Sequence, residues 1–248
     1  MSDIHSARHY LLQVVMPTYE QFGNTLTDGI AGDRRDLLAV GRAAEACLNL
    51  ADYVAKDPAC RDRVPGAPKS KNYVEQLTQQ NHWFAVTRDI ANVFKHHAIS
   101  RTDRNIDSVD ALKEHVALVR FADSDGYYYA MRKLVIVSLR NGERLYVGDI
   151  LYECIAAWIR ELMRLQQIPS APHLKRVPTR LVCRHDVPRQ PSIEMRAEQG
   201  EYFESNITVL EYDSVNDTYG SLRGKLEKVD FKVNWSVAKS RFGQTTSK

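Results

Sequence analysis

Residues 88–97, R-D-I-A-N-V-F-K-H-H, carry more potential chemistry than any other short stretch of the chain. At about 100° per residue, five polar side chains fall within roughly a third of a helical wheel: Arg88, Asp89, Asn92, Lys95 and His96. The other side of the wheel is apolar. Packing gives no reason for a guanidinium, a carboxylate, an amide, an ammonium and an imidazole to share one face, so this face is the first candidate site.

These residue types suit cleavage of an RNA phosphodiester by its own 2′-hydroxyl group. That reaction needs a general acid or base with a pKa of roughly 6–7, and cations that stabilise the developing charge. We predict His96 and Arg88 as catalytic residues, with His96 as the general acid or base. Lys95, Asn92 and Asp89 are predicted to bind and orient the substrate. Arg88 and His96 are eight residues apart, about 12 Å along a helix, so they would hold different parts of one ligand.

The segment R-D-I-A-N-V-F-K-H resembles the helix-borne R-x(4–6)-H signature of HEPN-type ribonucleases, in which a polar residue follows the arginine as Asp89 does here. The resemblance covers this helix and the helix before it, about a quarter of the chain. Seven residues, rather than four to six, separate Arg88 from His96. The resemblance implies a helical, usually dimeric protein that binds or cuts RNA without a metal, in a bacterial defence or toxin-type setting.

The block D-I-A-N-x-x-K-H is also similar to one that recurs in uncharacterised bacterial and phage-borne proteins of about this size. This second resemblance is closer, but it implies no activity. It directs attention to Asp89, Asn92, Lys95 and His96.

Several other interpretations of the same face stay open. Asp89 could cap or pair with a neighbouring helix, and the helix dipole alone favours Lys95 and His96 near a C-terminus. A non-catalytic module could use the polar helix face and the basic C-terminal tail to bind a protein partner. Alternatively, Asn92 and His96 could belong to a buried polar network. His97 falls on the apolar arc, which predicts a partly buried packing role.

Composition limits the other functions. The net charge of +3 gives no global nucleic-acid signature, and no apolar run approaches the roughly 20 residues that span a bilayer. We expect a cytoplasmic protein without a membrane contact. Phosphate-binding glycine loops and zinc-peptidase motifs are absent, so we predict no cofactor. We also predict no metal site, because Cys183-Arg184-His185-Asp186 is one run without a second ligand pair.

The pattern of elements predicts an α+β fold. A first helix is expected near 8–16, stopped or kinked at Pro17. Two more are expected over 37–55 and 73–99. The helix over 37–55 carries a stripe of small residues that lets a neighbouring helix approach closely. Strands over 116–121, 127–139 and 145–147, with turns at 123–126 and 141–142, predict a β-meander. A helix over 149–167, started by Asp149, covers it, and Cys47 and Cys154 are expected to be reduced core thiols.

The C-terminal region is expected to be small, β-rich and patterned in charge. Strands are predicted at 180–184, 207–212 and 228–237, and P-S-A-P at 169–172 predicts a boundary between domains at 1–168 and 173–248. Residues 197–219 hold six acidic and no basic residues, whereas residues 220–248 hold seven basic and two acidic ones. RNA, a protein partner and a second copy of the chain are the partners that these patterns suggest.

Overall fold

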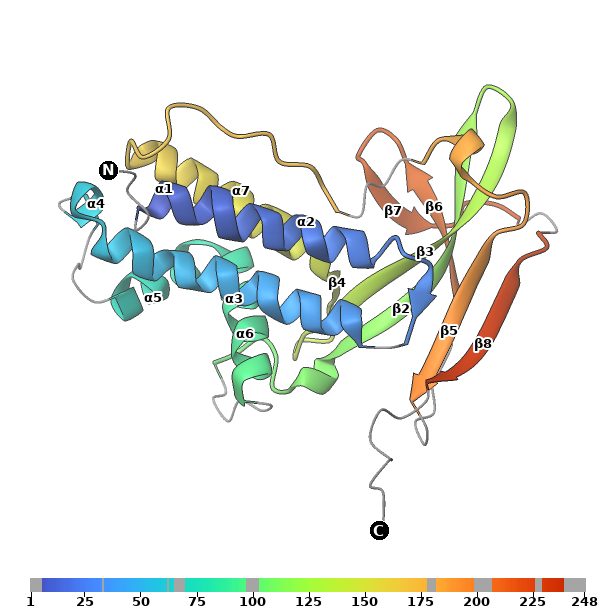
Figure 1. The fold of residues 1–248 in the computed structure, drawn as a ribbon, viewed down its shortest axis with the longest axis horizontal. Helices are drawn as coiled ribbons and strands as arrows, with labels where there is room; N and C mark the ends of the chain where they lie inside the picture. Colours follow the sequence, from blue (N-terminus) through green and yellow to red (C-terminus); the bar gives the residue numbers. More distant parts are fainter. Residues whose placement is uncertain are drawn as a thin grey trace, which may run out of the picture. The chain divides into compact units, whose positions relative to one another are not determined.

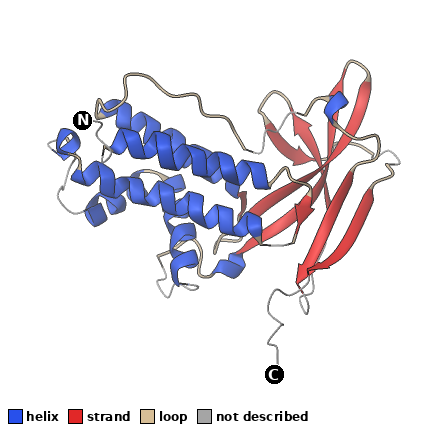
Figure 2. Ribbon diagram, in the orientation of Figure 1, coloured by secondary structure: helices blue, strands red, loops and turns tan. Residues whose placement is uncertain are grey.

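The computed structural model confirms an α+β fold, with helices and two β-sheets (Figure 2). It describes residues 6–32, 34–61, 63–64, 70–96, 103–177, 182–198, 207–225 and 229–238. The α-helices are α1 (Ala7–Tyr10), α2 (Met16–Thr25), α3 (Arg35–Lys56), α4 (Pro58–Arg61), α5 (Ser70–Gln80), α6 (His82–His96) and α7 (Val147–Arg164). Three short helical turns are η1 (Leu11–Val15), η2 (Val109–Ala111) and η3 (Arg184–Asp186). The strands are β1 (Ile30–Ala31), β2 (Leu112–Asp123), β3 (Gly126–Ser138), β4 (Arg144–Tyr146), β5 (Ser192–Glu198), β6 (Ile207–Asp213), β7 (Thr218–Ser221) and β8 (Lys232–Ala238) (Figure 1).

The chain divides into two compact units, and each unit is made from separate stretches of sequence. Unit 1 comprises residues 1–25, 37–113 and 135–179; unit 2 comprises residues 26–36, 114–134 and 180–248. The link at 169–172, where the sequence predicts a boundary, lies within unit 1. Strands β2 and β3 each contribute residues to both units.

The first helix does not end at Pro17. The helical path runs through α1, η1 and α2, and Pro17 is the second residue of α2. A proline lacks the N–H group and its ring clashes with the carbonyl of the residue four positions earlier. The turn just before it, η1, is a π-helix, whose wider hydrogen bonding provides the room that this residue needs.

The structure confirms the close approach of a neighbouring helix that the stripe of small residues on α3 predicts. Gly41 lies against α6, where a Cβ atom would be 2.7 Å from Cγ of Phe94. Real Cβ atoms essentially never come that close to another atom. Only a glycine at this position therefore allows α3 and α6 their observed spacing.

The predicted helix over 73–99 is wrong in one respect, because the structure divides it into α5 and α6 at Asn81. The side-chain oxygen of Asn81 accepts a hydrogen bond of 2.9 Å from the backbone N–H of Trp83. This is the N-cap interaction by which an asparagine competes with a continuous helix.

The core of unit 1 surrounds Trp158 of α7, one of the largest fully buried side chains. Its indole N–H donates a 2.9 Å hydrogen bond to the carbonyl of Cys47, and the rings of Phe84 and Tyr73 contact it edge-on. Cys47 and Cys154 are buried free thiols, as predicted. A hydrogen bond with Cys154, together with burial, raises the pKa of the Cys47 thiol.

The predicted β-meander is confirmed and is part of a larger sheet. The five strands lie in the order β4-β3-β2-β6-β7, with β3 and β4 antiparallel and β6 parallel to β2. Gly126 and Gly142 in the two predicted turns both have positive φ angles, of 108° and 86°. The helix predicted over 149–167 is α7, which begins at Val147, so the predicted cap Asp149 lies in its first turn instead.

A second sheet has the order β1-β5-β8, with all three strands parallel. Its buried side chains Ala31, Ile193 and Met195 form a small core in unit 2 together with Val116 of β2. The predicted strand at 207–212 corresponds to β6, and the one at 228–237 overlaps β8. The predicted strand at 180–184 is not formed by its described residues, since Arg184 begins η3 and residues 180 and 181 lie outside the described part.

A buried ion cluster joins the segment around β1 to β3 within unit 2. The Lys133 ammonium lies 2.8 Å from Asp28 and 3.0 Å from Asp36, and it also donates a hydrogen bond to the carbonyl of Ile30. Lys133 and Asp36 are almost completely buried. A buried cation is tolerated only when it is paired in this way.

Within the described residues, no helix combines the length and the apolar composition that a membrane span requires.

Replacing Gly41 by alanine should destabilise the protein. Alanine gains about 1 kcal/mol in helix propensity, but overpacking against Phe94 costs about 1–3 kcal/mol or more, so we expect a net loss. Urea denaturation measures the difference in the free energy of unfolding. Gly220→Ala is the control, because a Cβ atom at Gly220 meets nothing within 4 Å. A Gly41→Ala protein as stable as wild type would contradict the packing described for α3 and α6.

The ion cluster also predicts a dependence of stability on pH. Burial opposes ionisation of Asp28, but hydrogen bonds from Lys133 and from the backbone of Ile30 outweigh it and lower the pKa of Asp28 below its usual 3.8. A pKa that is lower in the folded protein adds stability above the unfolded pKa, and this stability is lost as the pH falls through the folded pKa. Urea denaturation between about pH 6 and pH 3 should therefore show a shallower decline for Asp28→Asn than for wild type. Identical pH profiles would contradict this role of Asp28.

Candidate functional site

The polar face of α6 has an internal half and an exposed half. Asp89 is completely buried and the Arg88 side chain is only 13% exposed, whereas the Lys95 side chain is 38% exposed and His96 is exposed. Asn92 is half-buried between them. The five residues therefore share one side of the helix, as predicted, but they do not share one environment.

Asp89 is the centre of the internal half. One carboxylate oxygen accepts hydrogen bonds from Arg88 Nε (3.0 Å) and Arg104 Nη1 (3.1 Å). The other accepts them from the backbone N–H (2.8 Å) and the side-chain amide (2.9 Å) of Asn105. Both oxygens are thus used within the protein, and they fix the segment 103–105 to α6.

Arg88 is held between this carboxylate and α5. Its Nη1 atom donates a 3.2 Å hydrogen bond to Oγ1 of Thr78. Arg88 also borders a crevice with Cys47 and Trp158, but the crevice holds only about 10 Å³, room for about one water molecule. A phosphate group cannot enter this space without displacing protein atoms.

The exposed half lies at the C-terminal end of α6. The Lys95 ammonium forms a 3.1 Å ion pair with Glu45 of α3, and both side chains are partly exposed. His96 is exposed, so the alternative in which it is buried in a polar network is wrong. His97, with its predicted packing role, lies outside the described residues.

The structure thus brings Arg88 and Asp89 together but leaves Lys95 and His96 about two turns further along α6. The guanidinium that would stabilise charge in the predicted reaction is committed to a buried carboxylate. Catalytic roles for His96 and Arg88 stay predictions.

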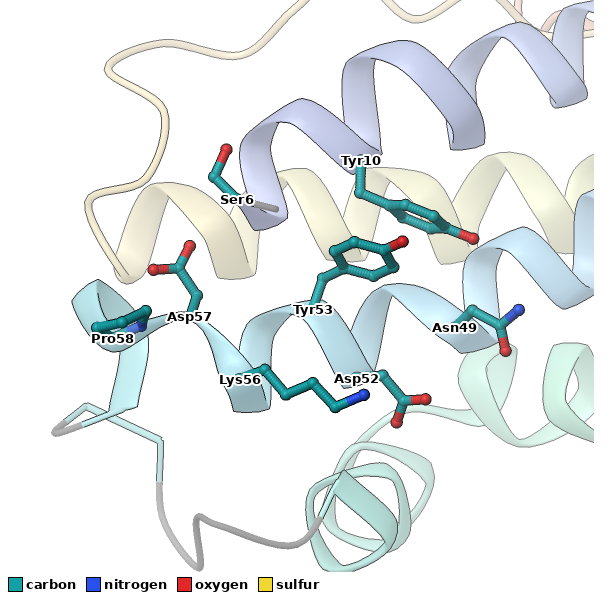
Figure 3. A pocket seen from close by; sticks show the side chains of 8 residues that line it. All are labelled: Ser6, Tyr10, Asn49, Asp52, Tyr53, Lys56, Asp57 and Pro58. Carbon is teal, nitrogen blue, oxygen red and sulfur yellow. The ribbon is translucent and has the colours of Figure 1, made fainter. Parts of the chain in front are cut away.

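A larger hollow lies elsewhere in unit 1, between α1 and α3. It has a volume of about 570 Å³ and is lined by polar and aromatic side chains that come from α1, from α3 and from the start of α4 (Figure 3): Ser6, Tyr10, Asn49, Asp52, Tyr53, Lys56, Asp57 and Pro58. None of the five predicted site residues is among them. Its signal in the sequence is the polar set at 49, 52, 53 and 56, which recurs at i, i+3, i+4 and i+7 along a predicted helix.

The side chains that line this hollow are suited to binding a ligand. The rings of Tyr10 and Tyr53 stack with centroids 3.9 Å apart, and burial raises the pKa of the Tyr10 hydroxyl despite a hydrogen bond with Asn49. Asp57 is occupied, since it accepts hydrogen bonds from the backbone N–H groups of Ala7 and Ala59. The lining offers hydrogen bonds and aromatic surface to a small polar molecule, and no nucleophile paired with a base.

Unit 2 has an exposed apolar surface on strand β8. Trp235 is 58% exposed, and Phe231, just before the strand, is 41% exposed. Trp235 lies opposite Met195 of β5, which is buried in the small core. Partnered residues of parallel strands lie on the same face of a sheet, so the apolar face of this core continues outward and ends at an uncovered tryptophan. The sequence predicts the strand but not its edge position, which depends on pairing with β5.

Comparisons with protein-family models, curated proteins and solved structures found no match to this chain.

The two halves of the α6 face should respond differently to substitution. Asp89→Asn should lower the free energy of unfolding by about 3–5 kcal/mol, because it leaves Arg88 and Arg104 without their buried partner. His96→Ala should change it by less than about 0.5 kcal/mol, because His96 is exposed. Urea denaturation of both variants measures the difference. Equal stability losses would contradict the division of this face.

Proposed function

We propose that this protein is a non-catalytic protein-interaction module, and that the edge of strand β8 binds an extended, acidic segment of a partner protein. The observation that carries the proposal is the exposure of Trp235 on a strand at the edge of the β1-β5-β8 sheet. Aromatic side chains are enriched in protein interfaces relative to the rest of the protein surface.

The edge position supplies the first part of the recognition. Among the described strands, β8 pairs with β5 along one side and with no strand along the other. An edge strand offers a row of backbone N–H and C=O groups to another extended chain. Proteins usually protect such an edge with charges, prolines or bulges, whereas the described part of β8 carries one charged residue, Lys232.

The face of the strand supplies the second part. Val233 and Trp235 lie opposite Ile193 and Met195 of β5, on the side that faces the small core, and they can contact apolar side chains of an added strand. The opposite side is polar. There Ser236 donates a 2.8 Å hydrogen bond to Glu194, which also forms a 2.8 Å ion pair with Arg196.

Charge favours an acidic partner. From residue 231 to the end, the chain has four basic residues and no acidic one: Lys232, Lys239, Arg241 and Lys248. A segment that alternates apolar and acidic residues matches both the apolar face and this charge. RNA would match the charge and could stack on Trp235, but it would leave the backbone groups of the β8 edge unpaired.

The alternative is the HEPN-type hypothesis, with RNA as substrate and His96 and Arg88 as catalytic residues. The buried contacts of Arg88 with Asp89 and Thr78 favour the non-catalytic proposal over it. Metal-free incubation with total RNA distinguishes the two, because the alternative requires cleavage that is lost in His96→Ala.

The proposal predicts binding of a blocked peptide in which valine and glutamate alternate. Fluorescence anisotropy of the labelled peptide should give a dissociation constant that Trp235→Ser and Lys232→Glu each raise by at least about tenfold, or 1.4 kcal/mol. Val215→Ser, which removes an exposed apolar side chain from the β6–β7 turn of the same unit, is the matched control and should have no effect. Peptides of alternating valine and lysine should not bind wild type.

Three results would contradict the proposal. One is peptide binding that is unaffected by Trp235→Ser. Another is tight binding of a single-stranded RNA, with no binding of the peptide, at equal salt concentration. The third is a stable dimer, by light scattering, that Trp235→Ser dissociates, because a second copy would then occupy the edge.

A further inference from the structure

Three side chains with metal-binding atoms come together on the turn η3 in unit 2. Cys183, His185 and Asp186 are all exposed, and the sulfur, an imidazole nitrogen and a carboxylate oxygen lie within 4.8 Å of one another. His185 Nε2 and Asp186 Oδ1 are 3.3 Å apart. Ligand atoms at about 2.0–2.3 Å from a tetrahedral ion are separated by roughly 3.3–3.8 Å, so the observed spacing needs little change to accept one.

The turn that carries these side chains is anchored by Arg184, which lies between Cys183 and His185 in the sequence. Arg184 donates two hydrogen bonds, of 2.8 and 2.6 Å, to the carboxylate of Asp123. It donates a third, of 3.0 Å, to the carbonyl of Gly126, and its guanidinium lies over the ring of Tyr128.

A second anchor lies one residue before the cluster. The Tyr128 hydroxyl donates a 2.5 Å hydrogen bond to the carbonyl of Val182. The carbonyl of Val182 and the side chain of Arg184 are therefore both attached to the β2–β3 hairpin, while the three candidate ligands are exposed. Because the turn is already ordered, little conformational entropy remains to be lost when an ion binds.

The ligand types select the ion. A thiolate and an imidazole with one carboxylate suit Zn²⁺, whereas Mg²⁺ and Ca²⁺ prefer oxygen ligands alone. Three protein ligands on an exposed turn leave a fourth tetrahedral position open to water.

We infer that Cys183, His185 and Asp186 form a binding site for one zinc-class divalent cation. The sequence predicts no metal site, because a single run of ligands is weak evidence by itself. The fold adds two observations to this run: the three ligand atoms lie within 4.8 Å of one another, and Arg184 between them is anchored to Asp123 and Gly126. The site is independent of the peptide-binding surface proposed for β8.

Titration of the full chain with Co²⁺ and Zn²⁺, under a reductant that does not bind metals, tests this inference. Co²⁺ should give a thiolate-to-metal charge-transfer band at one equivalent, and Zn²⁺ should displace it. Cys183→Ser should abolish the band. His185→Ala should weaken Zn²⁺ binding by more than about tenfold, because the loss of a group that only hydrogen-bonds to a metal ligand can already weaken affinity about tenfold. Arg184→Ala keeps all three ligands but should weaken binding several-fold by releasing the turn.

His173→Ala is the control, because it removes another exposed histidine and should change nothing. Binding should release protons and tighten with rising pH, since the thiol must ionise and the imidazole must be neutral. Absence of the charge-transfer band, or a band that persists in Cys183→Ser, would overturn the inference. So would equal Zn²⁺ affinity of wild type and His185→Ala when both are folded by circular dichroism.

Discussion

The carboxylate of Asp89 is buried in the middle of α6, and an ionised carboxylate in that position is costly unless every oxygen is satisfied. Two arginines and both donors of Asn105 satisfy it. The contacts hold the segment 103–105 against α6, and that segment leads through η2 into β2. The placement of the segment 103–105 against α6 therefore depends on one charged group.

This constraint changes the meaning of the polar face of α6. A cluster of charged residues on a helix indicates either a surface for a ligand or an internal connection to a neighbouring segment. The first part of the face, Arg88 and Asp89, makes the internal connection. Only its C-terminal end is open to solvent, at Lys95 and His96, and Lys95 is already paired with Glu45. The surfaces that we propose for binding are elsewhere, along the edge of β8 and on the turn η3.

Features that depend on neighbouring residues were predictable from the sequence. The periodicity of α3 and α7 and the glycine turns of the β-meander are local patterns, and the structure confirms them. The close approach at Gly41 was also predictable, because small residues at helical spacing are visible in the sequence itself. The break at Asn81 was missed because an asparagine inside a helical pattern has two local solutions, capping and continuation.

Features that depend on distant partners were not predictable. Arg104 and Asn105 gave no sign that they complete the environment of Asp89, since they follow the end of α6 and belong to no periodic pattern. Strand β5 was missed although its residues alternate, because it becomes a strand through pairing with β1 and β8. The turn that carries Cys183, His185 and Asp186 likewise has a distant partner, because Arg184 is bonded to Asp123, about 60 residues earlier.

A double-mutant cycle between Asp89 and Arg104 tests the central claim, that the internal half of the α6 face stabilises the fold. The free energies of unfolding of wild type, Asp89→Asn, Arg104→Met and the double variant are measured by urea denaturation. We predict a coupling energy of about 1–3 kcal/mol, with a double variant little less stable than Asp89→Asn alone. Stability losses that simply add, to within about 0.5 kcal/mol, would contradict the claim.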